Sequence, residues 1–122
     1  MNAENVIITK SESFAIRIIK LYQHITKKTN SEFVISKQLL RSGTSIGANV
    51  REAIQAQSRK DFVSKMNIAL KEASESEYWI ELLFKTDYLK ENEYNSLMSD
   101  GTELKKILVA IVKTSKQTPQ PQ

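Results

Sequence analysis

The sequence predicts an all-α protein that folds as an antiparallel up-down-up-down four-helix bundle. In four successive segments, apolar residues recur at alternating intervals of three and four, which is the period of one face of a helix. The chain of 122 residues also contains only 3 Gly and 2 Pro, too few for the many turns of a β-sandwich or barrel. Helices of similar length joined by short connections pack side by side.

The first helix is expected to begin near Ser11, a candidate N-cap, and to run to about Lys28. Its apolar stripe consists of Phe14, Ile18, Leu21, Tyr22 and Ile25. The preceding run Val6-Ile7-Ile8 is too short to form a helix by itself. Residues 1–9 are therefore expected to form an extended arm that docks on the bundle or on a neighbouring copy.

The other three helices follow after short connections. The second is expected over about residues 32–57. Ser58 reads as the N-cap of the third, which should end between residues 86 and 88. The fourth should begin between residues 90 and 93 and end by 116, so that residues 10–116 make up the bundle. The tail, residues 117–122, lacks apolar anchors and is expected to be disordered.

Each of these three helices carries an apolar seam with heptad spacing, which is typical of helices that pack at a shallow angle. The seam of the second helix is Leu39, Gly43, Ile46, Val50, Ala53 and Gln57. The seam of the third is Phe62, Met66, Ala69, Ala73, Ser76, Ile80 and Leu83. The seam of the fourth is Leu97, Gly101, Leu104, Leu108 and Ile111.

The run Gly43-Thr44-Ser45-Ile46-Gly47 matches the G-x-S-x-G pattern of a hydrolase nucleophile elbow. That chemistry needs a strand before the serine and a histidine after it, whereas this run lies in a helical seam and the one histidine, His24, precedes it. We interpret Gly43, Ser45 and Gly47 as small residues that let another helix pack closely. Without Glu-x-x-His pairs or a cofactor motif, we expect no enzyme, no metal site and no cofactor.

The charge is unevenly distributed along the chain. The net charge of +4 divides into +6 for residues 1–60 and −2 for residues 61–122. A basic surface can bind a polyanion such as RNA or DNA, or can complement an acidic surface on a neighbouring subunit. Arg41 and Arg51 can instead pair with Glu52 or with acids of the third helix. The nucleic-acid-binding candidates are Arg17, Lys20, Lys27, Lys28, Lys37, Arg41, Arg51, Arg59 and Lys60.

The third helix carries a second apolar stripe that cannot share its seam. Ile68, Trp79 and Leu82 lie on this stripe, interrupted by Glu72 and Glu75. Because a four-helix bundle has one core, a second apolar face indicates self-association, and these three residues are the predicted interface. The alternative is a broad core that tolerates an exposed tryptophan.

Composition excludes several other classes of protein. With no cysteine, the chain has neither disulfides nor thiolate metal sites, which suits a reducing compartment. No apolar run reaches the roughly 20 residues that span a bilayer, and the N-terminal residues do not resemble a secretory signal. We expect a cytoplasmic protein with no membrane partner and no small-molecule substrate.

The runs 41–54 and 58–79 resemble a family of small four-helix bundle proteins encoded in the intervening sequences of bacterial 23S ribosomal RNA genes, often labelled ribosomal proteins. The resemblance extends from about residue 10 to 116. Its most specific residues are Ser45, Ile46, Asn49, Glu52, Asp61, Phe62, Lys71 and Glu72. Where many members carry glycines and an arginine, this chain has Ala53, Gln55 and Ala56.

The resemblance implies a bundle that assembles as a closed ring of five subunits. It also implies kinship with the accessory variability protein of diversity-generating retroelements, a basic pentamer that binds nucleic acid, and it supplies no catalytic residues. The hypothesis is a non-enzymatic homo-oligomer, most simply a pentamer, that binds RNA or DNA through a basic surface. The alternative is a protein interaction scaffold that binds no nucleic acid.

Overall fold

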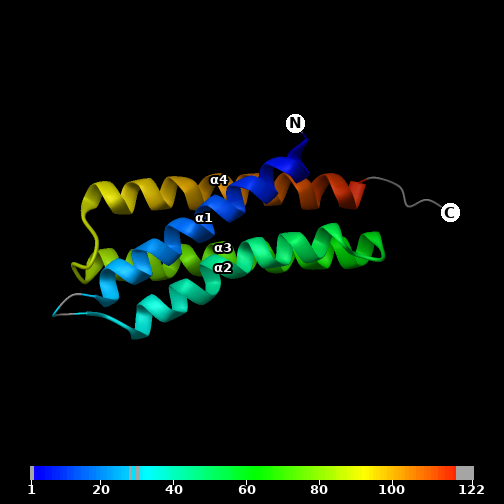
Figure 1. Ribbon diagram of the computed structural model, residues 1–122. Coiled ribbons are helices and arrows are strands. Elements are labelled where there is room, and N and C mark those ends of the chain that lie inside the picture. Colours follow the sequence, from blue (N-terminus) through cyan, green and yellow to red (C-terminus); the bar gives the residue numbers. More distant parts are fainter. Residues whose placement is uncertain (1, 28, 30, 118–122) are drawn as a thin grey trace.

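The computed structural model describes residues 2–27, 29 and 31–117, in which four long helices lie side by side (Figure 1). The helices are α1 (Ala3–Thr26), α2 (Val34–Ile54), α3 (Arg59–Lys85) and α4 (Glu91–Gln117). Consecutive helices run in opposite directions, and each helix contacts the next, while α4 returns to contact α1 (Figure 1). The contact between α1 and α4 is the least extensive of the four. The predicted all-α antiparallel bundle is confirmed.

The predicted seams form the core. Leu39, Ile46, Met66, Ile80 and Leu108 are all buried at the centre of one cluster that all four helices share. Two seam residues depart from the prediction: Phe62 is half-buried, and Gln57 lies exposed beyond the end of α2. Heptad spacing therefore identified the core-facing side of each of these helices.

The predicted start of the first helix is wrong. An extended arm was expected over residues 1–9, but residues 3–9 form the first two turns of α1. Asn2 caps the helix by accepting a hydrogen bond from the Asn5 amide at 2.9 Å. Ile7 is fully buried in the core, which supplies the packing energy that a short apolar run lacks alone. Ser11, the expected cap, is a buried residue inside the helix.

The start of α2 is capped by Glu32, the residue before the N-cap Phe33, whose own side chain makes no capping hydrogen bond. The carboxylate of Glu32 accepts hydrogen bonds from the amides of Ile35 and Ser36 at 2.8 and 2.7 Å, and from the Ser36 hydroxyl at 2.9 Å. Partial burial of this carboxylate raises its pKa, but the hydrogen bonds outweigh burial and hold the pKa of Glu32 below its ordinary value. The ionised form of Glu32 therefore stabilises the first turn of α2.

Both ends of α3 are fixed by local hydrogen bonds. Ser58 is the N-cap, as predicted, and its hydroxyl accepts from the Asp61 amide at 3.0 Å. At the other end, Asp87 adopts a positive φ of 70°, and the Tyr88 amide donates to the Leu83 carbonyl at 2.9 Å. This is a Schellman ending in which aspartate occupies the position that glycine usually takes. Gln117 is the last residue of α4, so the rest of the predicted disordered tail lies outside the described residues.

Candidate interaction surface on helices α2 and α3

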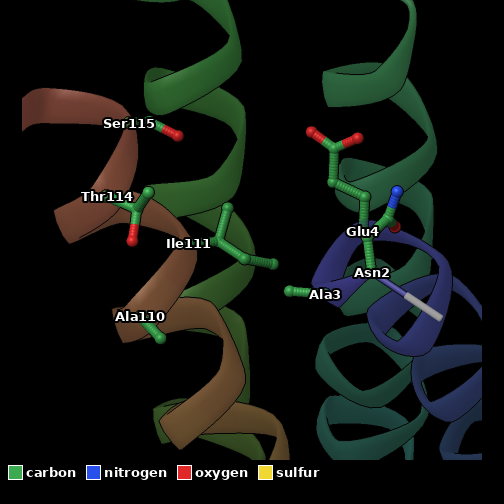
Figure 2. Close-up of a pocket in the computed structure, with 7 residues that line it drawn as sticks. All are labelled: Asn2, Ala3, Glu4, Ala110, Ile111, Thr114 and Ser115. Atoms are coloured by element: carbon green, nitrogen blue, oxygen red, sulfur yellow. The ribbon is translucent and has the colours of Figure 1, made fainter. Parts of the chain in front are cut away.

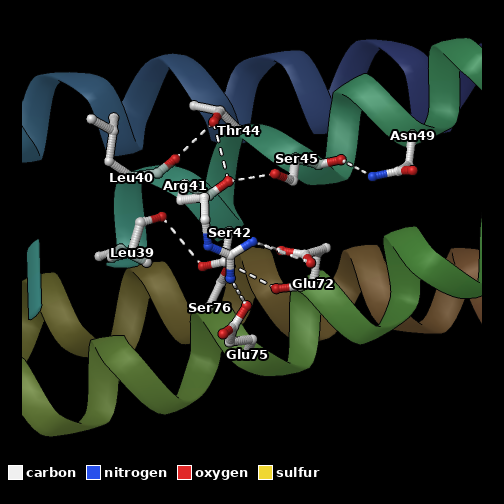
Figure 3. Close-up of polar contacts among 10 residues, drawn as sticks. All are labelled: Leu39, Leu40, Arg41, Ser42, Thr44, Ser45, Asn49, Glu72, Glu75 and Ser76. Atoms are coloured by element: carbon white, nitrogen blue, oxygen red, sulfur yellow. Dashed lines mark hydrogen bonds and ion pairs between the residues drawn. The ribbon is translucent and has the colours of Figure 1, made fainter. Parts of the chain in front are cut away.

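An ion cluster joins α2 to α3 on the outside of the bundle. Figure 3 shows the guanidinium of Arg41 between the carboxylates of Glu72 and Glu75. Arg41 donates to Glu72 at 3.2 Å and also to Glu75. The hydrogen bond to Glu75, opposed by slight desolvation and reinforced by the charge of Glu72, raises the pKa of Arg41 above its ordinary value. The pairing with acids of the third helix, one of the two predicted alternatives, is therefore present.

A buried serine pair lies beside this cluster. The hydroxyl oxygens of Ser42 and Ser76 are 2.9 Å apart, and both side chains are buried. Ser42 also lies 3.3 Å from the Leu39 carbonyl oxygen, and Ser76 lies 2.9 Å from that of Glu72 (Figure 3). Each hydroxyl has one proton to donate, and these distances leave neither proton without an acceptor. The pair fixes the relative position of α2 and α3 beneath Arg41.

Apolar side chains lie next to the ion cluster, two helical turns from it in one direction along the bundle. Val34 precedes Arg41 by seven residues, two helical turns, while Trp79 and Leu82 follow Glu72 and Glu75 by seven. Because α2 and α3 are antiparallel, Val34 lies level with Trp79 and Leu82. We call Val34, Tyr78, Trp79 and Leu82 the α2–α3 patch.

The members of the α2–α3 patch differ in exposure. Val34 is 73% exposed, and Tyr78 is 53% exposed with its ring 5.0 Å from that of Trp79. Trp79 and Leu82 are half-buried, and Trp79 packs against the core with its indole nitrogen covered and unpaired among the described residues. Ile68, the third predicted interface residue, lies towards the opposite end of α3 and is 37% exposed.

Val34 and Tyr78 are exposed apolar residues that the sequence prediction does not include. In the sequence, each of them is recognisable only as a large apolar residue that lies outside the seam of its helix. That signal alone does not separate a half-buried residue such as Trp79 from a fully accessible one such as Val34, because the distinction depends on the neighbouring helix.

Three of the arginines predicted to bind nucleic acid, Arg17, Arg41 and Arg51, form ion pairs within the bundle. Arg17 pairs with Asp100 on α4 at 2.8 Å, and Arg51 pairs with Glu12 on α1 at 2.5 Å. Arg59 also has an interaction partner. The predicted partners of Arg51 were Glu52 or acids of the third helix, whereas its partner is Glu12 on α1. Arg17 and Arg51 each pair with an acid on another helix, and the sequence pattern did not identify these acids.

The lysines among the predicted nucleic-acid-binding residues are dispersed. Lys20 lies in the last two turns of α1, and Lys27 follows the last residue of that helix. Lys37 lies early in α2, and Lys60 is the second residue of α3, at the opposite end of the bundle. All four are exposed, and none has an ion-pair partner among the residues that the structure describes. Lys28 lies outside the described residues. The structure does not gather the predicted cations into one continuous surface.

The two glycines of the G-x-S-x-G run face α1. A β-carbon at Gly43 would lie 3.0 Å from both γ-carbons of Ile18, and one at Gly47 would lie 3.4 Å from the Ser11 hydroxyl. Ser45 is half-buried, and its hydroxyl donates to the Arg41 carbonyl at 2.6 Å inside α2. A serine held in the middle of a helix in this way does not have the geometry of a nucleophile elbow.

A pocket opens between the start of α1 and the end of α4. Figure 2 shows its lining, and its volume is about 270 Å³. The lining residues are Asn2, Ala3, Glu4, Ala110, Ile111, Thr114 and Ser115. Within the described part of the chain, no cluster of three metal-ligating side chains occurs, and no helix is long and apolar enough to cross a membrane.

Comparison with known proteins identifies the family. The chain matches the 23S rRNA-intervening sequence protein family over residues 3–110, nearly all of its length. It is also similar to the crystal structure of a protein of unknown function from the S23 ribosomal protein family of Bacteroides thetaiotaomicron. The two chains are 54% identical with a TM-score of 0.89, and the match covers 92% of this chain and 99% of the other. No curated protein matches. The chain belongs to the 23S rRNA-intervening sequence protein family.

Proposed function

We propose that the protein acts without catalysis as a homo-oligomer, and that the α2–α3 patch is one face of the contact between subunits. The observation that carries this proposal is the exposure of Val34 and Tyr78 beside the half-buried Trp79 and Leu82. Exposed apolar side chains gathered at one level of a surface are costly in water and typically mark an interface. The neighbouring Arg41 cluster would supply a polar rim.

A closed ring of five is the assembly that we propose. A ring with an odd number of subunits joins two different faces of each chain, so the α2–α3 patch needs a second apolar face to contact. Ile16 and Ile19 on α1 are 47% and 39% exposed and lie three residues apart on one side of that helix. They supply such a face away from the α2–α3 patch.

Light scattering on a size-exclusion column, at tens of micromolar protein, tests this proposal. We expect the wild-type chain to elute with the mass of a pentamer and Val34→Glu to shift the mass towards the monomer. Val109→Glu is the matched control, because Val109 is also exposed but lies on α4. A monomeric wild type, or equal effects of the two substitutions, would overturn the proposal.

Nucleic-acid binding is a second candidate function. It is favoured by the sequence pI of about 9.3 and by exposed lysines that have no ion-pair partner in the described residues. If the protein binds nucleic acid, it should retain duplex RNA or DNA at about 50 mM salt and release it as the salt approaches 200 mM, as electrostatic binders do. A chain that retains neither ligand at low salt would act as a protein interaction scaffold alone.

A further inference from the structure

The hairpin of α3 and α4 separates its charges along its length. Residues 59–71 contain four cations and one acid, and residues 104–117 contain four cations and no acid, a net charge of +7 together. The intervening residues 72–103 contain nine acids and two cations, a net charge of −7. Dividing the chain into halves conceals this pattern, because the second half sums to −2.

The antiparallel packing of α3 and α4 brings the two basic stretches together. The first turns of α3 lie beside the last turns of α4, at one end of the bundle (Figure 1). We call residues 59–71 and 104–117 the basic half of the hairpin. Its cations are Arg59, Lys60, Lys65, Lys71, Lys105, Lys106, Lys113 and Lys116.

Most lysines of the basic half are available to a ligand. Lys65 pairs with Glu52 at 3.4 Å, and Lys105 pairs with Glu77 at 2.7 Å. The other five lysines are all exposed and have no ion pair in the described part of the chain: Lys60, Lys71, Lys106, Lys113 and Lys116.

The helix repeat sets the spacing of these exposed lysines. Lys106 and Lys113 lie seven residues apart on one side of α4, about 10.5 Å along the helix. Lys60 and Lys71 lie eleven residues apart on α3, about 16 Å. The outcome is a row of unpaired cations on each of two adjacent helices.

We propose that the basic half of the hairpin is the surface that contacts the phosphate backbone of a nucleic-acid duplex. This inference rests on the nucleic-acid function proposed above and moves the contact from α1 and α2 to α3 and α4. Exposed aromatic side chains that could stack on unpaired bases, Phe33, Tyr78 and Tyr88, lie towards the other end of the bundle. Lysines without such platforms suit the backbone of a duplex.

Two double charge reversals of equal size test the location. Lys106→Glu with Lys113→Glu alters the basic half, and Lys20→Glu with Lys27→Glu alters α1. The residues of each pair are seven apart and exposed, and each double reversal changes the net charge from +4 to 0. Binding of mixed-sequence duplex RNA and duplex DNA of about 20 base pairs is titrated between about 50 and 200 mM salt.

We expect the α4 pair to weaken duplex binding by roughly 10–100-fold at low salt and to reduce the salt slope by about two, since two phosphate contacts are lost. The α1 pair should change affinity by less than about threefold at the same salt. Helix content from circular dichroism checks that both variants are folded, and Lys106→Gln with Lys113→Gln should give an intermediate loss.

The outcomes separate this inference from the function on which it rests. If wild type binds and both charge reversals weaken it equally, or the α1 pair weakens it more, the proposed surface is wrong while nucleic-acid binding stands. If wild type binds no duplex at low salt, nucleic-acid binding itself is refuted. If the α4 pair instead lowers the oligomer mass and leaves duplex affinity unchanged, the basic half contacts an acidic surface of a second copy and the proposal is overturned.

Discussion

The two glycines in the middle of α2 should respond in opposite ways to alanine. Alanine favours a helix interior over glycine by about 1 kcal/mol at either position. At Gly47 the added β-carbon would lie 3.4 Å from the Ser11 hydroxyl, an ordinary contact, so the helix term dominates. Gly47→Ala is therefore expected to raise the free energy of unfolding by up to about 1 kcal/mol.

At Gly43 the packing term opposes the helix term. The β-carbon would lie 3.0 Å from two carbons of Ile18, which is buried and, being β-branched, has a single preferred rotamer in a helix. Relieving this contact requires a shift of α1 against α2, and overpacking of this kind costs about 1–3 kcal/mol. After the helix gain of about 1 kcal/mol, Gly43→Ala should lie between neutral and about 2 kcal/mol destabilising.

Urea unfolding followed by far-UV circular dichroism measures the stability of both variants at one protein concentration, so that any self-association affects both measurements alike. The expected difference between the two variants is about 1–3 kcal/mol, with Gly47→Ala the more stable. Leucine at either position should destabilise, since its larger side chain would overpack the contact with α1 at Ile18 or Ser11. A Gly43→Ala variant as stable as Gly47→Ala would refute the close approach of α1 and α2 at Ile18.

Two further substitutions test the polar contacts of α2. Arg41→Met should lower the free energy of unfolding by about 1 kcal/mol, more than Arg51→Met does. It leaves the Glu72 side chain, only 18% exposed, without its cation, whereas both side chains of the Arg51 pair are exposed. Equal losses of stability in urea unfolding at low salt would contradict this prediction. Glu32→Gln should cost about 1 kcal/mol near neutral pH. The pKa of Glu32 is lower in the folded than in the unfolded chain. The stabilisation by Glu32 is therefore present above the unfolded pKa and is lost as the pH falls from about 5 through the folded pKa. The free energies of unfolding of wild type and Glu32→Gln should converge in acid.

Much of the fold follows from the sequence because it depends on local periodicity. Apolar residues at heptad spacing identify the buried side of a helix whatever it packs against, and Leu39, Met66 and Leu104 are buried as the seams predict. The Ser58 cap could also be predicted, because the capping hydroxyl and the amide that donates to it lie three residues apart. The start of α1 was not predicted, although the Asn2 cap is as local as the Ser58 cap. The helix there depends on the burial of Ile7 in the core, which a short apolar run does not reveal.

The candidate surfaces depend on tertiary structure to a much greater degree. The sequence alone determined the number of cations and the presence of apolar residues outside the seams. Only the packing of the helices decided that Arg17, Arg41 and Arg51 are neutralised by acids on other helices, and that Val34 lies level with Leu82. Only the antiparallel α3–α4 pairing placed two basic stretches, more than thirty residues apart in the chain, at one end of the bundle. Electrostatic interaction depends on the distance between charges in space, and the packing of the helices sets those distances.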